Sequence, residues 1–269
     1  MAYGLSLHVG VGSVDEQHYL GWSGQAPSCE HDASNMAALA KSCGFFPTLL
    51  LTRDATADRV LDEIRKAAGR LNGGDILLIS YSGHGTTVPD INGDEPSGQD
   101  DVWALYNRML IDDELYSLWS EFHLGVRVVV VVDSCTDGTI ISVPLSLQQI
   151  SHRQKQLHAR AMPREVTNLV YKAHQTFYDD IQMKTTRHPP QSTVLLLSSS
   201  QDGEPSFDDG SNGLFTRALT NVWQNGKFEG HYCNMYVEIS NRTRTLQNPN
   251  FYLIGPTDPV FPCQKPFKI

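Results

Sequence analysis

Blocks of apolar residues alternate along the chain with amphipathic blocks, and the two kinds predict strands and helices in turn. The apolar runs at 75–82 and 126–135 are almost uninterrupted, which is typical of parallel strands covered on both faces. Similar runs predict strands at 3–12, 45–52, 192–200 and 248–255, and helical spacing predicts helices at 31–44, 57–71 and 212–226. This alternation predicts an α/β fold: a three-layer sandwich with a mostly parallel central sheet of about six strands and helices on both faces.

Residues 143–191 interrupt this rhythm. Within them, apolar residues at helical spacing predict a helix over 163–181, and Pro163 suits its first turn. The flanks of this helix are polar and basic, so we expect exposed loops there rather than a domain boundary. The chain is therefore predicted to form a single domain over 1–269.

The composition narrows the classes of function. The formal net charge is −9 and no block is rich in Lys and Arg, which argues against a nucleic-acid partner. Five scattered cysteines without a C-x-x-C pair predict free thiols in a reducing compartment. The N-terminus lacks a signal-peptide pattern and no apolar run reaches 18 residues. We therefore expect a cytoplasmic protein with no membrane partner.

Two reactive side chains follow the ends of the two most apolar runs. His84 stands in "SGHG" after 75–82, and Cys135 ends "VVVVVDSC". Taken singly, each has a plainer interpretation, a solvated loop histidine and a core cysteine. If the two strands are neighbours, however, both side chains lie at the same carboxyl edge of the sheet. A thiol beside an imidazole is a nucleophile beside its base, and the N–H groups of Gly85 and Cys135 would stabilise an oxyanion.

The motifs "YSGHG" and "DSC", with 51 positions from His84 to Cys135, resemble the metacaspase and bacterial caspase-like branch of the caspase-fold cysteine peptidases. Segments such as "GDILLISYSGHG", "GQDDVWALYN" and "SSSQDGEPSFDDGSNGLFTRALTNVW" agree, so the similarity extends over roughly 4–255. The resemblance implies a caspase-like sandwich with His84 as base and Cys135 as nucleophile, and no cofactor for the chemistry. It also implies a p20-like part over about 1–145, a linker with its helix over about 146–191, and a p10-like part over about 192–269.

The resemblance further implies a specificity pocket. The positions that match Cys29, Asp32, Ser82 and Asp133 line the S1 pocket of metacaspases, which binds the side chain before the scissile bond. Two carboxylates favour Arg or Lys there, best through a bidentate guanidinium contact, and repel Asp. The predicted partners are protein or peptide substrates with a basic residue before the cut. Taken alone, Asp32 is equally well interpreted as the N-cap of its helix.

One departure from the family concerns the residues after the nucleophile. The family continues "DSC" with His-Ser-Gly, whereas Thr136 and Asp137 stand here. The Asp137 carboxylate would raise the pKa of the thiol or pair with a cationic substrate, which favours reduced activity or a zymogen. A weak or inactive caspase-fold regulatory module is the alternative, although the presence of both His84 and Cys135 argues against it. A small-molecule hydrolase is disfavoured because the Gly-x-Ser-x-Gly elbow is absent.

The acidic segment 90–103 suggests a cation site. An EF-hand register fails because Glu95 stands where glycine is needed. The resemblance implies instead that Asp100, Asp112 and Asp113 supply oxygen ligands to calcium. Ser142 replaces a further acidic ligand of the family, which weakens the predicted site. The alternative is a solvated acidic loop, with 112–113 opening a helix whose dipole favours carboxylates.

The basic loops 151–164 and 184–190 are predicted sites of activating cleavage, by this chain or by another protease. They contain Arg153, Lys155, Arg160, Arg164, Lys184 and Arg187. The alternative is the ordinary composition of a solvated loop. A monomer is expected, and a regulatory partner is left open.

Overall fold

A six-stranded sheet forms the centre of the molecule. The computed structural model describes residues 2–135, 157–186, 188–201, 204–256 and 258–269. The strand order is β11-β9-β7-β3-β1-β2, and only β11 runs antiparallel to its neighbour. These strands are β1 (Gly4–Gly10), β2 (Phe46–Leu51), β3 (Ile76–Ser82), β7 (Arg127–Asp133), β9 (Thr193–Ser198) and β11 (Asn250–Ile254).

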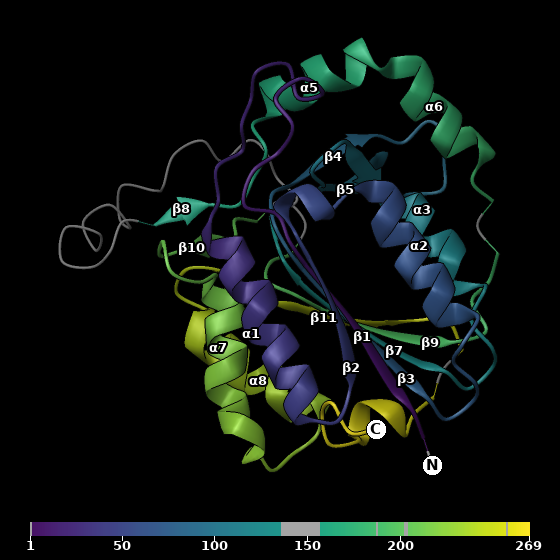
Figure 1. Cartoon of the computed structure of the whole chain (residues 1–269), viewed down its shortest axis with the longest axis vertical. Helices are drawn as coiled ribbons and strands as arrows, with labels where there is room; N and C mark the ends of the chain where they lie inside the picture. The colour runs from purple at the N-terminus through teal and green to yellow at the C-terminus, as the bar shows by residue number, and fades with distance from the viewer. Residues whose placement is uncertain (1, 136–156, 187, 202–203, 257) are drawn as a thin grey trace.

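Helices cover both faces of this sheet, as the sequence predicts (Figure 1). One core lies under α1 (Ser28–Ser42), α7 (Leu214–Trp223) and α8 (Tyr232–Thr243). The other lies under α2 (Ala57–Ala68) and α3 (Asp112–Trp119). Because side chains alternate along a strand, Ile76 and Leu78 of β3 enter the first core, and Leu77 and Ile79 enter the second. The three-layer α/β sandwich is confirmed. Among the described helices, none has the length and apolar character that a membrane span requires.

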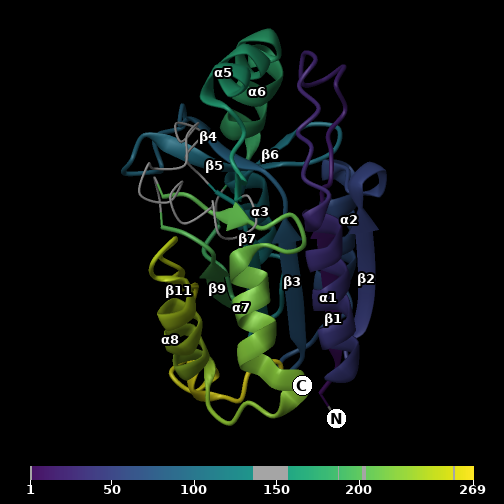
Figure 2. The same ribbon diagram turned by 90° about the vertical axis from the view of Figure 1, so that its left-hand side faces the viewer.

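Several elements were not predicted from the pattern. A second sheet, β4-β5-β6, comprises β4 (Gly85–Pro89), β5 (Gln99–Ala104) and β6 (Met109–Ile111). The helix expected over 163–181 is two helices, α5 (Arg164–Ala173) and α6 (Gln175–Lys184), which meet at His174. Figure 2 shows this pair beyond the carboxyl end of the sheet. Shorter elements are β8 (His158–Ala159), β10 (Phe207–Asp208) and 3-10 turns at Thr52–Asp54, Gln224–Gly226 and Phe261–Cys263.

The register of β3 and β7 sets the level of the candidate site. The two strands are parallel neighbours, as the sequence analysis requires, and Ser82 pairs with Asp133. His84 and Cys135 each follow that pair by two residues. Both therefore leave the sheet at the same height of its carboxyl edge, where functional groups gather in α/β folds.

Candidate active site

The chain segments that carry His84 and Cys135 are in direct backbone contact. The His84 and Cys135 side chains are buried. A Cβ atom placed on Gly85 would lie 2.2 Å from the carbonyl oxygen of Cys135, so only glycine permits this approach. Trp22 covers the imidazole, with its ring edge-on to that of His84 and the ring centroids 5.0 Å apart. The loop before α1 thus closes the site over the candidate base.

The two N–H groups predicted to form the oxyanion hole converge on one oxygen atom. The N–H of Gly85 donates to the carbonyl oxygen of Arg160 at 3.2 Å, and the N–H of Cys135 donates to the same oxygen at 3.1 Å. Two converging backbone donors are the arrangement that stabilises a developing oxyanion. The oxygen they hold belongs to a residue of the linker.

The side chain of Arg160 is completely buried among carboxylates and hydroxyls. Its Nη2 lies 2.6 Å from Asp32 Oδ2, its Nη1 lies 3.4 Å from Asp133 Oδ1, and its Nε lies 3.5 Å from Asp208 Oδ2. Because the three carboxylates outweigh the burial penalty, the pKa of Arg160 stays well above its usual value. Its guanidinium also donates to Ser82 Oγ at 2.7 Å, Ser28 Oγ at 3.0 Å and the carbonyl oxygen of Asp133 at 3.2 Å.

The structure brings the four predicted pocket residues together around this guanidinium. Asp32, Ser82 and Asp133 contact it directly. Cys29 is buried nearby, and burial raises the pKa of its thiol to about 11 although Arg160 opposes the shift. The interpretation of Asp32 as an N-cap is wrong, because α1 begins at Ser28 and Asp32 lies inside the helix.

Sequence reasoning missed three residues of this pocket. Ser28 and Asp208 bind the guanidinium, and Gly213 forms a wall. The N–H of Gly213 donates to Asp32 Oδ2 at 3.0 Å. A Cβ atom on Gly213 would lie 2.1 Å from Asp133 Oδ2 and 2.5 Å from Arg160 Nη1. The segment "SFDDGSNG" contains the signal, since two of its members are a carboxylate and a glycine, but nothing in it indicates which part of the chain they face.

The main chain around Arg160 runs through the site as an extended strand. β8 pairs antiparallel with β10, and the N–H of Arg160 donates to the carbonyl oxygen of Ser206 at 2.9 Å. After Arg160, Ala161 bridges to Gly85 and the N–H of Met162 donates to the carbonyl oxygen of Gly85 at 2.8 Å. Backbone bonds of this kind are how an added strand binds a protein edge. The residues on both sides of the Arg160–Ala161 bond are therefore held.

The candidate nucleophile and base are not engaged with each other. The thiol of Cys135 donates to the carbonyl oxygen of Glu204 at 3.0 Å. Among the described residues, neither ring nitrogen of His84 makes a well-formed hydrogen bond. Burial, together with the Arg160 guanidinium, lowers the pKa of His84 to about 4, while Asp208 and backbone groups of Gly24 and Ala161 oppose the shift. The imidazole is thus held neutral, as a base requires.

The predicted calcium ligands are placed differently from one another. Asp100 is fully buried, and its carboxylate lies within 4.8 Å of those of Asp90 and Asp94. Asp112 and Asp113 instead begin α3, where Asp113 Oδ2 accepts from Asn92 Nδ2 at 3.0 Å. Asp137 and Ser142 lie outside the described residues, as do Thr136, Arg153, Lys155 and Arg187.

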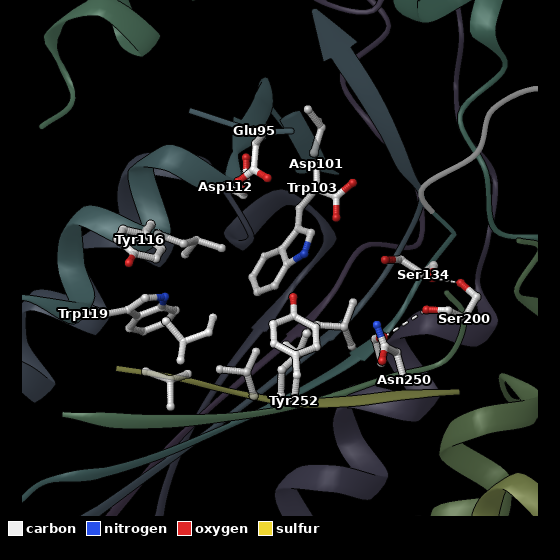
Figure 3. A pocket seen from close by; sticks show the side chains of 18 residues that line it. Glu95, Asp101, Trp103, Asp112, Tyr116, Trp119, Ser134, Ser200, Asn250 and Tyr252 are labelled. Atoms are coloured by element: carbon white, nitrogen blue, oxygen red, sulfur yellow. Dashed lines mark hydrogen bonds between the residues drawn. The ribbon is translucent and has the colours of Figure 1, made fainter. Parts of the chain in front are cut away.

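A separate cavity of about 440 Å³ lies on the opposite face of β7. Val130, Val132 and Ser134 point into it, whereas Asp133 points to Arg160, as the alternation of a strand requires. Figure 3 shows its aromatic walls and its acidic rim. This cavity is therefore not the guanidinium pocket.

We expect Gly213→Ala to destabilise the protein by about 1–3 kcal/mol, because the added methyl overlaps Asp133 and Arg160. Urea unfolding measures the change in the free energy of unfolding. Gly69→Ala is the matched control. Gly69 has a φ of −71°, and the nearest atom to its added Cβ would be 3.6 Å away, so its change should stay within about 0.5 kcal/mol. Equal effects of the two substitutions would contradict the pocket geometry.

A second prediction concerns the pH dependence of stability. Since the pKa of His84 is about 4 in the fold and 6.5 in a free imidazole, the unfolded chain binds the additional proton between these values. Stability should therefore fall as the pH drops below about 6.5. At pH 5.0 this effect is worth about 2 kcal/mol, and His84→Asn removes it. Urea unfolding at pH 7.5 and 5.0 should show the larger loss for the wild type; identical losses would contradict the neutral buried imidazole.

Comparison with known proteins follows from this geometry. A family model described as the caspase domain matches residues 14–261. Metacaspase-1B of Aspergillus fumigatus is 30% identical over 142 residues, which cover 47% of this chain and 35% of the relative. Metacaspase-1 of Kluyveromyces lactis is 25% identical over 239 residues, which cover 76% of this chain and 55% of the relative. The chain thus spans between about a third and about half the length of these curated relatives.

Solved structures agree. A protein from Geobacter sulfurreducens is 42% identical, with a TM-score of 0.86 and 99% of each chain covered. Caspase-1 from Spodoptera frugiperda is 13% identical, with a TM-score of 0.57 over 93% of this chain and 86% of the other, and shows the likeness of fold alone. The chain belongs to the caspase-domain family, and its curated sequence relatives include metacaspases.

Proposed function

We propose that this protein is a cysteine endopeptidase that cleaves after basic residues, Arg in particular. His84 is the base, Cys135 the nucleophile, and the N–H groups of Gly85 and Cys135 form the oxyanion hole. The observation that carries the proposal is the position of Arg160. Its carbonyl oxygen lies on both N–H groups while its guanidinium lies between Asp32 and Asp133, as the residue before a scissile bond would lie.

The chemistry follows from these positions. His84 accepts the thiol proton, and Cys135 Sγ attacks the carbonyl carbon of the bound residue. The two N–H donors stabilise the oxyanion that forms. His84 then returns the proton to the leaving amine, and water hydrolyses the thioester. No step needs a metal or cofactor.

The pocket is built for a guanidinium rather than for an ammonium. Asp32, Asp133 and Asp208 each face a different nitrogen of Arg160, and a single ammonium nitrogen cannot meet all three. Burial raises the pKa of Asp133, and the Arg160 charge opposes that shift. A cationic side chain therefore favours the ionised pocket, and an Asp side chain is repelled. Arg should be preferred to Lys.

The enzyme as described would be latent, in keeping with a zymogen. Arg160 fills the specificity pocket, and the Cys135 thiol is bonded to Glu204 instead of His84. Both contacts must be released before another peptide can react. An occupied pocket would also suit an inactive regulatory module, which is the second candidate function. The two candidates differ in whether Cys135 turns over a peptide.

Calcium is retained as a regulatory proposal with a revised ligand set. Asp90, Asp94 and Asp100 offer hard carboxylate oxygens close enough for one cation, and calcium would need further oxygen ligands. Their loop follows β4, directly after the His84 segment, so cation binding would order a strand beside the base. The chemistry itself does not use the ion.

The specificity proposal is tested with a peptide panel bearing Arg, Lys or Asp before the cut. We expect turnover in the order Arg then Lys, none after Asp, and none with Cys135→Ala. Asp208→Asn should lower kcat/KM for Arg peptides about tenfold, the value of one charge-assisted contact, and affect Lys peptides less. Asp209→Asn is the control, since Asp209 bonds the backbone of Ser211 and Asn212. Turnover only after Asp would refute the proposal.

The calcium proposal is tested on stability. Added calcium should raise the Tm of the wild type through preferential binding to the fold, and Asp100→Asn should abolish the rise. Glu121→Gln, which changes an exposed carboxylate elsewhere, should preserve it. No rise in the wild type at millimolar calcium, with peptide turnover unaffected by a chelator, would remove calcium from the account.

A further inference from the structure

We propose that the Arg160–Ala161 peptide bond is this enzyme's first substrate: the chain cuts itself there, within one molecule, and the intact bond keeps the site latent. This inference rests on the proposed function. It goes beyond that proposal because it assigns one bond of the linker as the processing site.

The bond is already placed as a bound substrate on both of its sides. On the N-terminal side, the β8–β10 pairing and the Arg160–Ser206 backbone bond fix the chain; Figure 1 shows β8 beside β10. On the C-terminal side, the N–H of Met162 donates to Gly85, and the Met162 side chain is fully buried in the core. The entropy of orienting the peptide is therefore spent on folding, which favours an intramolecular reaction.

Other basic residues of the linker do not share this placement. Arg164 and Lys184 are exposed and lie at the ends of α5 and α6. A helical backbone does not present the extended strand that the groove pairs with. Among the described basic residues of the linker, Arg160 alone has its carbonyl oxygen on the Gly85 and Cys135 N–H groups.

Cleavage at this bond has to occur within one molecule. The Arg160 side chain has no exposed surface and is held by three carboxylates of its own chain. A second molecule would have to extract the guanidinium and unpair β8 before it could bind the bond. Another protease with a basic preference meets the same obstacle.

The step balances without a further reactant except water. The Cys135 thiol leaves the Glu204 carbonyl and gives its proton to His84, and Sγ bonds to the carbonyl carbon of Arg160. The bond to the Ala161 nitrogen breaks as His84 protonates that nitrogen. Water then hydrolyses the thioester, which regenerates the thiol and leaves a carboxylate on Arg160 and an amino group on Ala161.

Arg160 also acts as an intramolecular competitor. A tethered segment has an effective concentration in the millimolar range, and a peptide bound with a KM near 100 µM would then be outcompeted by about tenfold. Arg160→Gln should therefore raise kcat/KM for an Arg peptide by about tenfold or more, without any cut in the chain.

The test follows the intact mass of the purified full chain over time, together with hydrolysis of an Arg peptide. We expect the wild type to yield fragments 1–160 and 161–269, and Cys135→Ala to stay whole even when mixed with Arg160→Gln protein. Arg164→Gln is the matched control and should be cut as the wild type is. Ala161→Pro keeps Arg160 and its pocket but makes a poor substrate bond, so it should stay whole should Arg160→Gln fail to fold.

The outcomes separate this inference from the proposed function. Peptide hydrolysis with cuts only at other positions, or with no cut, overturns the assignment of Arg160–Ala161 and leaves the peptidase proposal standing. Cleavage of Cys135→Ala by the Arg160→Gln protein overturns the intramolecular step. Absence of hydrolysis by every variant, including a folded Arg160→Gln, overturns both.

Discussion

One buried guanidinium organises the carboxyl edge of this molecule. Arg160 has no solvent contact, so its charge is tolerated only because Asp32, Asp133 and Asp208 surround it. Removing a single partner from such a group leaves uncompensated buried charge, at a cost of about 3–5 kcal/mol. The three carboxylates come from α1, the end of β7 and β10, elements distant in sequence. The ion network therefore joins the linker, the dyad-bearing strands and the C-terminal part of the chain.

The same network is held in place by groups that serve no charge of their own. Asp133 accepts from the N–H and hydroxyl of Thr216 at 2.8 and 2.7 Å, at the start of α7. Asp32 accepts from Gly213. Since these donors also favour the ionised carboxylates, the pocket keeps its negative charge when a cation is present. Its shape then follows from two glycines, Gly85 against Cys135 and Gly213 against Asp133, where any side chain would overlap.

Sequence reasoning reached the sheet and the residues at strand ends because both are local signals. Continuous apolar runs identify buried parallel strands, and residues two positions past such runs lie at one edge once the strands are neighbours. His84, Cys135, Ser82 and Asp133 were found in this way or through family resemblance. The placement of Arg160 was not predicted, because its loop is polar and a buried cation looks there like a solvated one. Asp208 was missed for a related reason: its role depends on a hairpin, β8 with β10, whose strands have two residues each and no periodicity.

The latent and the reactive arrangements differ by the location of one proton and one charge. With Arg160 in the pocket, its charge and burial keep His84 neutral, which suits a base, while Glu204 holds the thiol proton away from it. When the guanidinium leaves, the pKa of Asp133, already raised by burial, loses the cation that opposes the rise. An empty pocket then tends to take up a proton, and an arriving Arg substrate must release it. Binding of the substrate is thereby coupled to pH through the pocket rather than through the dyad. The latency of the site and its preference for Arg thus have one physical cause, the need of buried carboxylates for a guanidinium.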